Sequence, residues 1–422
     1  MSDSGFRMSD SGLAIRDERF TVRQKLLVGL TALTVVFDGV DNQLLGVSIP
    51  TIMAEWGVPR SAFAPVVSLG NLGMMIGGAA AGISGDRIGR RSALLACVAF
   101  FGAATIAMAF VGDARTLAVL RLLAGLGLGG AMPNAATLAA EYSPVRWRPL
   151  AVTVTIVCMP LGATVAGMLG SQFLAHAGWR QLFVIGGVVP IVAAALLFRL
   201  MPESPEYLAR QAHRPATVTA PKAPVSTIFE SSLRRDTFAL WGAFVSCMLA
   251  VYLGLSWLPA LLTDAGFTPA AASHGITAFN LGGVAGAIGG GLALSRVGSR
   301  VAMLTMTAGA IAATAALAVL RIDASSPAPA LLLVTISGGL INAVQTTMYA
   351  LATNVYASAI RATGVGIAVA VGRIGAVASG YAGAWVLQRG GGWYFGAMAV
   401  AMTVCFVMLA IVRRHVGERV QS

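Results

Sequence analysis

The stretch LLVGLTALTVVFDGVDNQLLGVSIPTIM, from Leu26 to Met53, is a long apolar run that carries two aspartates, Asp38 and Asp41, near its centre. A helix needs about 20 apolar residues to span the hydrocarbon core of a bilayer, and this run is long enough. A charged residue at the centre of such a helix costs about 2.5–3.5 kcal/mol on insertion scales. Two aspartates in one run therefore need a reason, and the reason depends on whether the chain folds in water or in lipid.

The composition of the whole chain indicates lipid. Hydrophobic residues make up 57% of the 422 residues and charged residues only 11%, whereas soluble domains carry about 25% charged residues. The mean hydropathy is +0.78. Because only helices and closed barrels satisfy every backbone group in lipid, long continuous apolar runs indicate helices. We therefore expect an all-α membrane protein with about twelve transmembrane helices.

The apolar runs form two sets of six with a polar segment between them. We predict a cytoplasmic N-terminal tail (1–25), a first six-helix half (26–200), a cytoplasmic linker (201–236), a second six-helix half (237–412) and a cytoplasmic C-terminal tail (413–422). The motif LGATVAG at Leu161–Gly167 matches IGAVASG at Ile374–Gly380, in the fifth helix of each half. Such an internal repeat is typical of transporters that bind substrate between their halves.

The distribution of basic residues predicts the orientation. With both termini in the cytoplasm, the inner loops and tails hold 22 of the 29 lysines and arginines, and the outer loops hold five. This bias follows the positive-inside rule and predicts a multi-pass protein of the cell inner membrane. The net charge of +12 is therefore a consequence of topology. No basic stripe with interleaved aromatic residues is present, so we expect no nucleic-acid partner.

Enzyme and metal chemistry have no support in the sequence. The four cysteines stand in apolar runs without CxxC spacing, which indicates buried side chains rather than disulfides or metal ligands. The chain contains no nucleophile elbow, phosphate loop or HExxH motif. We expect no enzyme activity, no catalytic residues, no metal and no cofactor.

The segment GDRIGRR, Gly85–Arg91, joins the second and third predicted helices, and SRVGSR, Ser295–Arg300, stands at the corresponding place in the second half. Glycines allow a tight turn, an aspartate can cap the next helix, and arginines remain in the cytoplasm. The alternative role is a topological anchor without moving parts. The segment resembles the signature loop of the major facilitator superfamily, which implies the major facilitator fold. The resemblance also implies a cytoplasmic gate made of Gly85, Asp86, Arg87, Gly89, Arg90 and Arg91, which we extend to Arg146 and Arg148.

A narrower resemblance rests on three further motifs. RLLAGLGLGGAMPNAATLAAEYSPVRWR at Arg121–Arg148, DGVD at Asp38–Asp41 and MPESPEYL at Met201–Leu208 resemble the aromatic acid:proton symporters of that superfamily. The resemblance implies transport of 4-hydroxybenzoate, protocatechuate, benzoate, muconate or a similar carboxylate. Pro160 follows Met159 rather than glycine, so the Gly-Pro pair of the drug–proton antiporters is incomplete. This departure favours symport.

The charged residues within the predicted helices are the candidates for proton coupling. Asp38 and Asp41 are three residues apart and share one helix face, which must point into the bundle. Ionisable groups inside the membrane usually line a pathway, which favours a functional role over a purely structural ion pair with Arg121 or Arg373. We expect the coupling ion to be H⁺ and its residues to be Asp38, Asp41, Arg121 and Glu141.

Arg373 is the clear mid-span cation of the second half. Its guanidinium has the fork geometry that binds a carboxylate with two hydrogen bonds. Aromatic and amide side chains in the second half could stack on or hydrogen-bond an aromatic acid, although a core or interface role is the alternative for each. The predicted substrate residues are Arg373, Asn280, Asn342, Gln345, Tyr349, Tyr381 and Trp257.

The sequence thus predicts a proton-coupled symporter that imports a small aromatic carboxylate by alternating access. Its expected partners are a small organic anion and membrane lipid, and we expect a monomer. One alternative is a transporter of the same fold for another small solute, such as a dicarboxylate, nicotinate or a sugar. Another is a proton-driven efflux protein.

Overall fold

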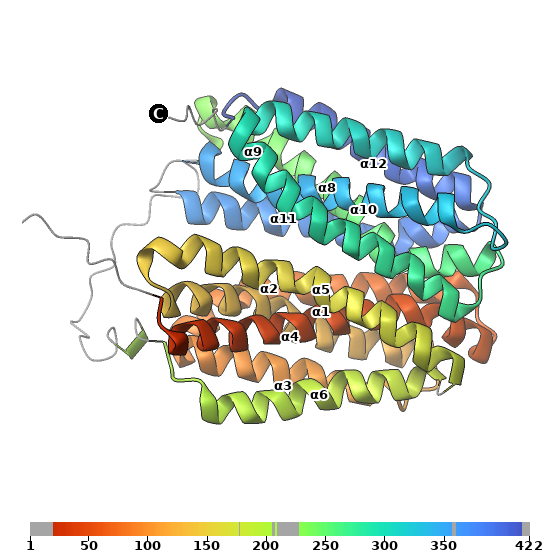
Figure 1. Cartoon of the computed structure of the whole chain (residues 1–422), viewed down its shortest axis with the longest axis horizontal. Helices are drawn as coiled ribbons and strands as arrows, with labels where there is room; N and C mark the ends of the chain where they lie inside the picture. The colour runs from red at the N-terminus through yellow and green to blue at the C-terminus, as the bar shows by residue number, and fades with distance from the viewer. Residues whose placement is uncertain (1–19, 177, 205–206, 209–227, 357–359, 416–422) are drawn as a thin grey trace, which may run out of the picture.

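The computed structural model describes residues 20–176, 178–204, 207–208, 228–356 and 360–415. Within these residues the chain forms helices and no strands (Figure 1), which confirms the all-α class. The elements in chain order are α1 (Val22–Trp56), η1 (Arg60–Phe63), α2 (Ala64–Ile88), α3 (Arg90–Met108), α4 (Ala114–Tyr142), η2 (Val145–Trp147), α5 (Arg148–His176), α6 (Gly178–Leu200), α8 (Ser231–Asp264), α9 (Pro269–Val319), α10 (Ala328–Val355), α11 (Arg361–Leu387) and α12 (Gly391–Ile411).

Helix α9 consists of two helical segments that meet at a kink at Gly298. The backbone there has φ 76° and ψ 162°, a conformation that is not helical and that glycine adopts most easily. Gly298 lies in SRVGSR, the segment that was expected to join two helices of the second half, and the two helical parts of α9 agree with that expectation. By length and composition, ten helices in the described part of the chain can cross a membrane, with α9 counted once and α1 not among them. The number of crossings therefore stays a prediction.

The glycine-rich faces let the helices of the first set approach closely. A Cβ atom at Gly39 of α1 would overlap the carbonyl oxygen of Met159 in α5, and a Cβ at Gly162 would overlap that of Val36. Backbone-to-backbone contact of this kind is the small-residue packing typical of membrane helices. It fixes α1, and with it the two aspartates, against α5.

Helices α1–α6 and helices α8–α12 form two groups that lie side by side (Figure 1). The start of α1 and the end of α12 lie at the same end of the bundle, which we call the tail face. The opposite end, with the 57–63 segment and Asp264, is the loop face. Linker residues 209–227 lie outside the described part of the chain.

Contacts between the two groups gather toward the loop face. Arg60 forms an ion pair with Asp264, and its Nη1 donates to the carbonyl oxygen of Leu387 at 3.4 Å. Further along α2, the Ser68 hydroxyl donates to the Val377 carbonyl at 2.8 Å and the Asn71 amide to the Ala376 carbonyl at 2.7 Å. These bonds join α1–α6 to α8–α12 on the side away from the tails.

Candidate substrate and proton site

Asp41 is held by donors from two neighbouring helices. Nη1 of Arg121, on α4, lies 3.0 Å from Asp41 Oδ2, and the hydroxyl of Thr105, on α3, donates to Asp41 Oδ1. Arg121 also donates to the backbone carbonyls of Asp41 at 3.3 Å and Asn42 at 3.1 Å. A Cβ at Gly70 would lie 2.7 Å from Arg121 Cγ, so the glycine leaves room for the arginine. The structure thus brings two of the predicted coupling residues together as a buried ion pair.

Asp38, one turn earlier on α1, has no such partners. Its side chain is only 1% exposed, and neither carboxylate oxygen accepts a hydrogen bond from the residues that the structure describes. A buried polar group without a partner is rare and costly, more so when it is charged. The two aspartates share a helix face as predicted, but their surroundings differ.

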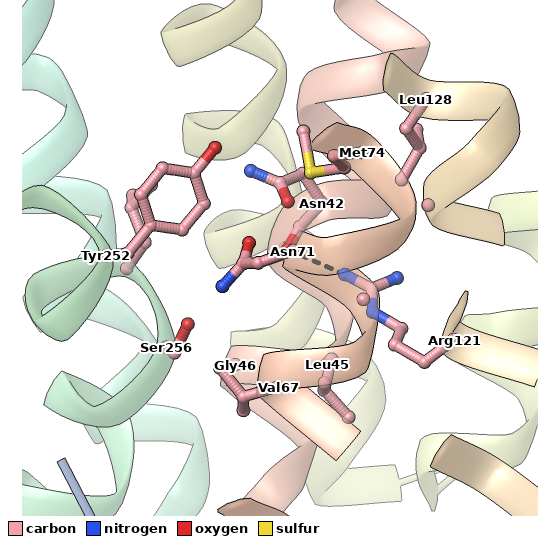
Figure 2. Close-up of a pocket in the computed structure, with 13 residues that line it drawn as sticks. Asn42, Leu45, Gly46, Val67, Asn71, Met74, Arg121, Leu128, Tyr252 and Ser256 are labelled. Carbon is pink, nitrogen blue, oxygen red and sulfur yellow. Dashed lines mark hydrogen bonds between the residues drawn. The ribbon is translucent and has the colours of Figure 1, made fainter. Parts of the chain in front are cut away.

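A pocket beside this pair lies between the two helix groups (Figure 2). Helices α1, α2 and α4 form one wall and α8 forms the other. Its polar lining consists of Asn42, Asn71, Arg121, Tyr252 and Ser256. The remainder is glycine, methionine and aliphatic side chains. A pocket that combines apolar side chains with convergent polar groups is a candidate small-molecule site.

Arg373 of α11 lies against two residues of this lining. Its Nη1 donates to the Tyr252 hydroxyl at 2.5 Å and lies 3.9 Å from the sulfur of Met74. The guanidinium carbon is 5.7 Å from the centroid of the Tyr252 ring. Within the described residues no carboxylate forms an ion pair with Arg373. The guanidinium therefore remains available for an anion from outside the chain.

The other predicted substrate residues do not line the pocket. Trp257 is fully buried, and its Nε1 donates to the Ser379 carbonyl at 3.1 Å. The amides of Asn280 and Asn342 donate to carbonyls of their own helices, at 2.9 and 2.8 Å. Tyr381 is 59% exposed, away from the helix interfaces. The roles of these residues stay predictions, as do those of Gln345 and Tyr349, whose ring meets Phe244 edge-on.

The predicted gate segment is tied to the chain just after α6. Gly89 has φ 95°, and a Cβ there would lie 2.5 Å from Glu203 Oε2. The Glu203 carboxylate accepts the backbone N–H groups of Arg91 at 2.9 Å and Ser92 at 3.3 Å. Glu203 thus caps the start of α3, where the sequence predicted Asp86. The side chain of Asp86 lies outside the described residues, and the gate stays a prediction.

The remaining tail-face residues lie away from the aspartates. Glu141, at the end of α4, accepts a hydrogen bond from the Ser204 hydroxyl, so the structure does not bring it to the Asp41–Arg121 pair. Arg148 Nε lies 3.5 Å from the Ser143 carbonyl, and Arg146 is exposed. Gly85 packs on Asn134, and the Arg87 carbonyl accepts the Tyr207 hydroxyl at 3.2 Å. Arg90 is half-buried beside Gly85.

Sequence reasoning missed several residues of the site. Asn42 and Asn71 stand out as amides in apolar runs, and a search for every polar residue in the helices would have found them. Tyr252 and Ser256 are one turn apart on α8, which is a weaker signal. Thr105 has no sequence signal, because most helical threonines in this chain bond to their own helix.

A helical membrane bundle with a buried ion pair and a pocket between two helix groups is typical of a solute transporter. Residues 31–377 match the Major Facilitator Superfamily, and the chain belongs to this superfamily. It is therefore a multi-pass membrane protein of a transporter family.

Relatives and solved structures agree with this assignment. A gallate transporter of Pseudomonas putida is 36% identical over 395 residues, which cover 87% of this chain and 86% of that protein. The 4-hydroxybenzoate transporter PcaK of Pseudomonas putida is 33% identical, covering 90% of this chain and 89% of that protein. The xylose transporter XylE from E. coli, in an inward-open conformation, shares the fold with a TM-score of 0.73 at 17% identity, over 94% of this chain and 98% of that one. The resemblance to aromatic acid transporters is confirmed.

Proposed function

We propose that the protein imports a small aromatic carboxylate across the inner membrane together with a proton. The observation that carries this proposal is Arg373: a guanidinium at the edge of a pocket between the helix groups, bonded to a phenol and a thioether rather than to a carboxylate. A poorly solvated guanidinium without a counter-ion binds a carboxylate strongly. The relatives named for gallate and 4-hydroxybenzoate support the same class of substrate.

In the proposed complex the substrate carboxylate binds Arg373 and the ring lies in the pocket. Met74, Leu128 and the Tyr252 ring supply apolar and aromatic contact. Ser256, on the α8 wall with Tyr252, and the amides of Asn42 and Asn71, on the opposite wall, can receive ring hydroxyls (Figure 2). The Ser256 hydroxyl is suited to this role because it forms no hydrogen bond with the described residues.

The proposed transport cycle follows from where the helix groups are joined. If the tails are cytoplasmic, as the arginine distribution predicts, the Arg60–Asp264 and Ser68–Val377 contacts close the outer side, and the structure corresponds to an inward-facing conformation. The six-helix halves, 26–200 and 237–412, would then rock about the pocket. In the outward-facing conformation, the gate segment at 85–91 would meet the second half. We propose that a monomer carries out the whole cycle.

The proposed proton site is the pair Asp38 and Asp41, next to Arg121. Protonation of a carboxylate in this cluster removes one negative charge from the site in which Arg373 binds the substrate. Substrate and proton then favour each other's binding, which is the requirement for symport.

The test is uptake by purified protein in proteoliposomes with an inward proton gradient. The solutes compared are gallate, 4-hydroxybenzoate, benzoate, nicotinate, succinate and xylose. We expect gradient-dependent accumulation of the aromatic acids and none of xylose. Accumulation of a non-aromatic solute alone, or transport only in the efflux direction, would overturn the proposed function.

A further inference from the structure

The two aspartates of α1 have such different hydrogen-bond partners that only one of them is suited to bind the coupled proton. We propose that Asp38 alone carries the coupled proton, that Asp41 remains a fixed carboxylate throughout the cycle, and that Thr105 of α3 is the positioning residue that enforces this division. The inference rests on the proposed function and specifies how its proton site works.

Asp41 is poorly suited to exchange a proton. Its two oxygens are engaged separately, Oδ1 by the Thr105 hydroxyl and Oδ2 by Arg121 Nη1 at 3.0 Å. Arg121 is 5% exposed, and its other hydrogen bonds go to backbone carbonyls. Protonation of Asp41 would therefore leave a buried guanidinium without a counter-ion, which is strongly unfavourable.

Asp38 has the opposite surroundings. It is as buried as Asp41, yet neither oxygen accepts a hydrogen bond from the described residues. Asp38 therefore lacks the hydrogen bonds that stabilise a buried carboxylate, so it accepts a proton more readily than Asp41 does. The charged or titratable groups that face it are Asp41 on its own helix, Cys97 on α3, Arg121 on α4 and Arg373 on α11.

Arg373 then links the proton to the substrate. When its guanidinium is free, its positive charge attracts the Asp38 carboxylate and offsets part of the cost of burying that charge. When a substrate carboxylate neutralises it, that attraction is lost and Asp38 takes up a proton. One proton enters on an Asp38 oxygen with each substrate anion, and it leaves when the substrate leaves. Asp41 and Arg121 cancel each other's charge and take no part in the exchange.

Thr105 fixes the Asp41 carboxylate so that Oδ2 faces Arg121. Its side chain is fully buried, and its oxygen also lies 2.9 Å from the Phe101 carbonyl of its own helix. Without the hydroxyl, Asp41 loses one of its two side-chain hydrogen-bond donors. It then becomes able to compete with Asp38 for the coupled proton. Thr105→Val removes the hydroxyl at nearly constant shape, and Thr105→Ser restores it.

The experiment compares Asp38→Asn, Asp41→Asn, Thr105→Val and Thr105→Ser in proteoliposomes, each checked for folding by size-exclusion chromatography. Thr34→Val is the matched control, because its buried hydroxyl donates to the Thr31 carbonyl of the same helix. Two activities are measured with 4-hydroxybenzoate: accumulation driven by a proton gradient, and counterflow exchange without a gradient at a series of pH values.

We expect Asp38→Asn to keep counterflow at a rate independent of pH and to lose accumulation. Asp41→Asn loses both activities. Thr105→Val lowers the accumulation ratio roughly two- to tenfold, the range of one hydrogen bond, and alters the pH profile of counterflow, whereas Thr105→Ser and Thr34→Val match the wild type.

Other outcomes would overturn the inference. Retained counterflow in Asp41→Asn with loss in Asp38→Asn would reverse the two roles. Loss of counterflow in both variants would mean that the pair titrates as one unit. A wild-type pH profile in Thr105→Val would reduce Thr105 to a packing role. If the wild-type protein accumulates no aromatic acid, the proposed function itself has failed, and that result is seen before any variant is made.

Discussion

Among single residues, we expect substrate binding to depend most on Arg373. Arg373→Lys keeps the charge but loses the planar fork, which an ammonium cannot reproduce. Truncating a buried hydrogen-bonded charge pair costs about 2–5 kcal/mol. Because lysine retains the charge, we expect the lower end of that range, a rise of roughly 30-fold in the half-saturation constant for 4-hydroxybenzoate uptake.

Arg389→Lys is the control for this prediction. Arg389 lies just after the end of the same helix, with its guanidinium 3.6 Å from the Trp385 ring centroid and outside the pocket. Its substitution should leave uptake unchanged. Equal half-saturation constants for Arg373→Lys and the wild-type protein would mean that another cation binds the carboxylate.

Ser256 provides a second prediction, about which aromatic acids are preferred. If its hydroxyl bonds a ring hydroxyl, Ser256→Ala should weaken gallate uptake by about 1 kcal/mol, roughly fivefold, without affecting benzoate. Ser246→Ala on the same helix is the control, because the Ser246 hydroxyl already donates to the Gly242 carbonyl at 2.7 Å. The measurement is the ratio of half-saturation constants for gallate and benzoate. An unchanged ratio in Ser256→Ala would show that the ring hydroxyls bind elsewhere.

Among the helices, α1 carries the aspartates and its packing on α5 sets their position. Gly39→Ala would place a methyl group against the Met159 carbonyl, backbone that cannot move aside cheaply. Gly29→Ala, on the same helix, meets nothing within 4 Å. We expect Gly39→Ala to lower the thermal midpoint of the purified protein and abolish proton-driven uptake. Gly29→Ala should leave both unchanged or raise stability slightly, as alanine favours helix. Similar midpoints for the two variants would contradict this account of α1.

The two halves repeat each other more closely in structure than in sequence. Gly89 and Gly298 occupy the same place in GDRIGRR and SRVGSR, and both have positive φ, 95° and 76°. Each segment is also bound by a residue that follows the sixth helix of its half. Glu203, after α6, caps Ser92, and His415, after α12, lies 3.1 Å from Ser299. Burial, and then the charge of Arg300, lowers the pKa of His415, so the imidazole bonds Ser299 in its neutral form near pH 7.

Across the whole molecule, the sequence was most informative at charged side chains inside apolar helices, because a charge buried in lipid needs a partner. Asp38 and Asp41 were expected to need an arginine, either Arg121 or Arg373, because charges in lipid need partners, and the structure pairs Asp41 with Arg121. Tyr252 and Ser256 were not expected in the pocket, since their position depends on how α8 faces α1 across the two helix groups. Glu203 was missed as the cap of α3 because it lies more than a hundred residues from Arg91. Local pattern identifies which residues need partners, and tertiary packing decides which partners they find.

The same packing makes a prediction about the conformational equilibrium of the whole protein. Arg60 and Asp264 join the two helix groups at the loop face, with side chains 23% and 40% exposed. An ion pair this exposed contributes only about 0–1 kcal/mol, so its loss should shift the equilibrium between closed and open loop faces by no more than about fivefold. We expect Asp264→Asn to shift it toward the open state by about that amount.

The measurement uses Ser68→Cys in a variant whose four native cysteines are replaced. Ser68, on α2, is 4% exposed and its side chain contacts α11. An impermeant maleimide therefore reaches a cysteine at this position only when the loop face opens. The rate of labelling should rise up to about fivefold in Asp264→Asn. Glu55→Gln is the matched control, because it breaks the Glu55–Arg180 ion pair at the same face within the first helix group, where the side chains are 41% and 44% exposed. Its labelling rate should equal that of the parent. A rise of the same size in both variants would mean that loss of charge at this face, rather than loss of a link between the halves, opens the transporter.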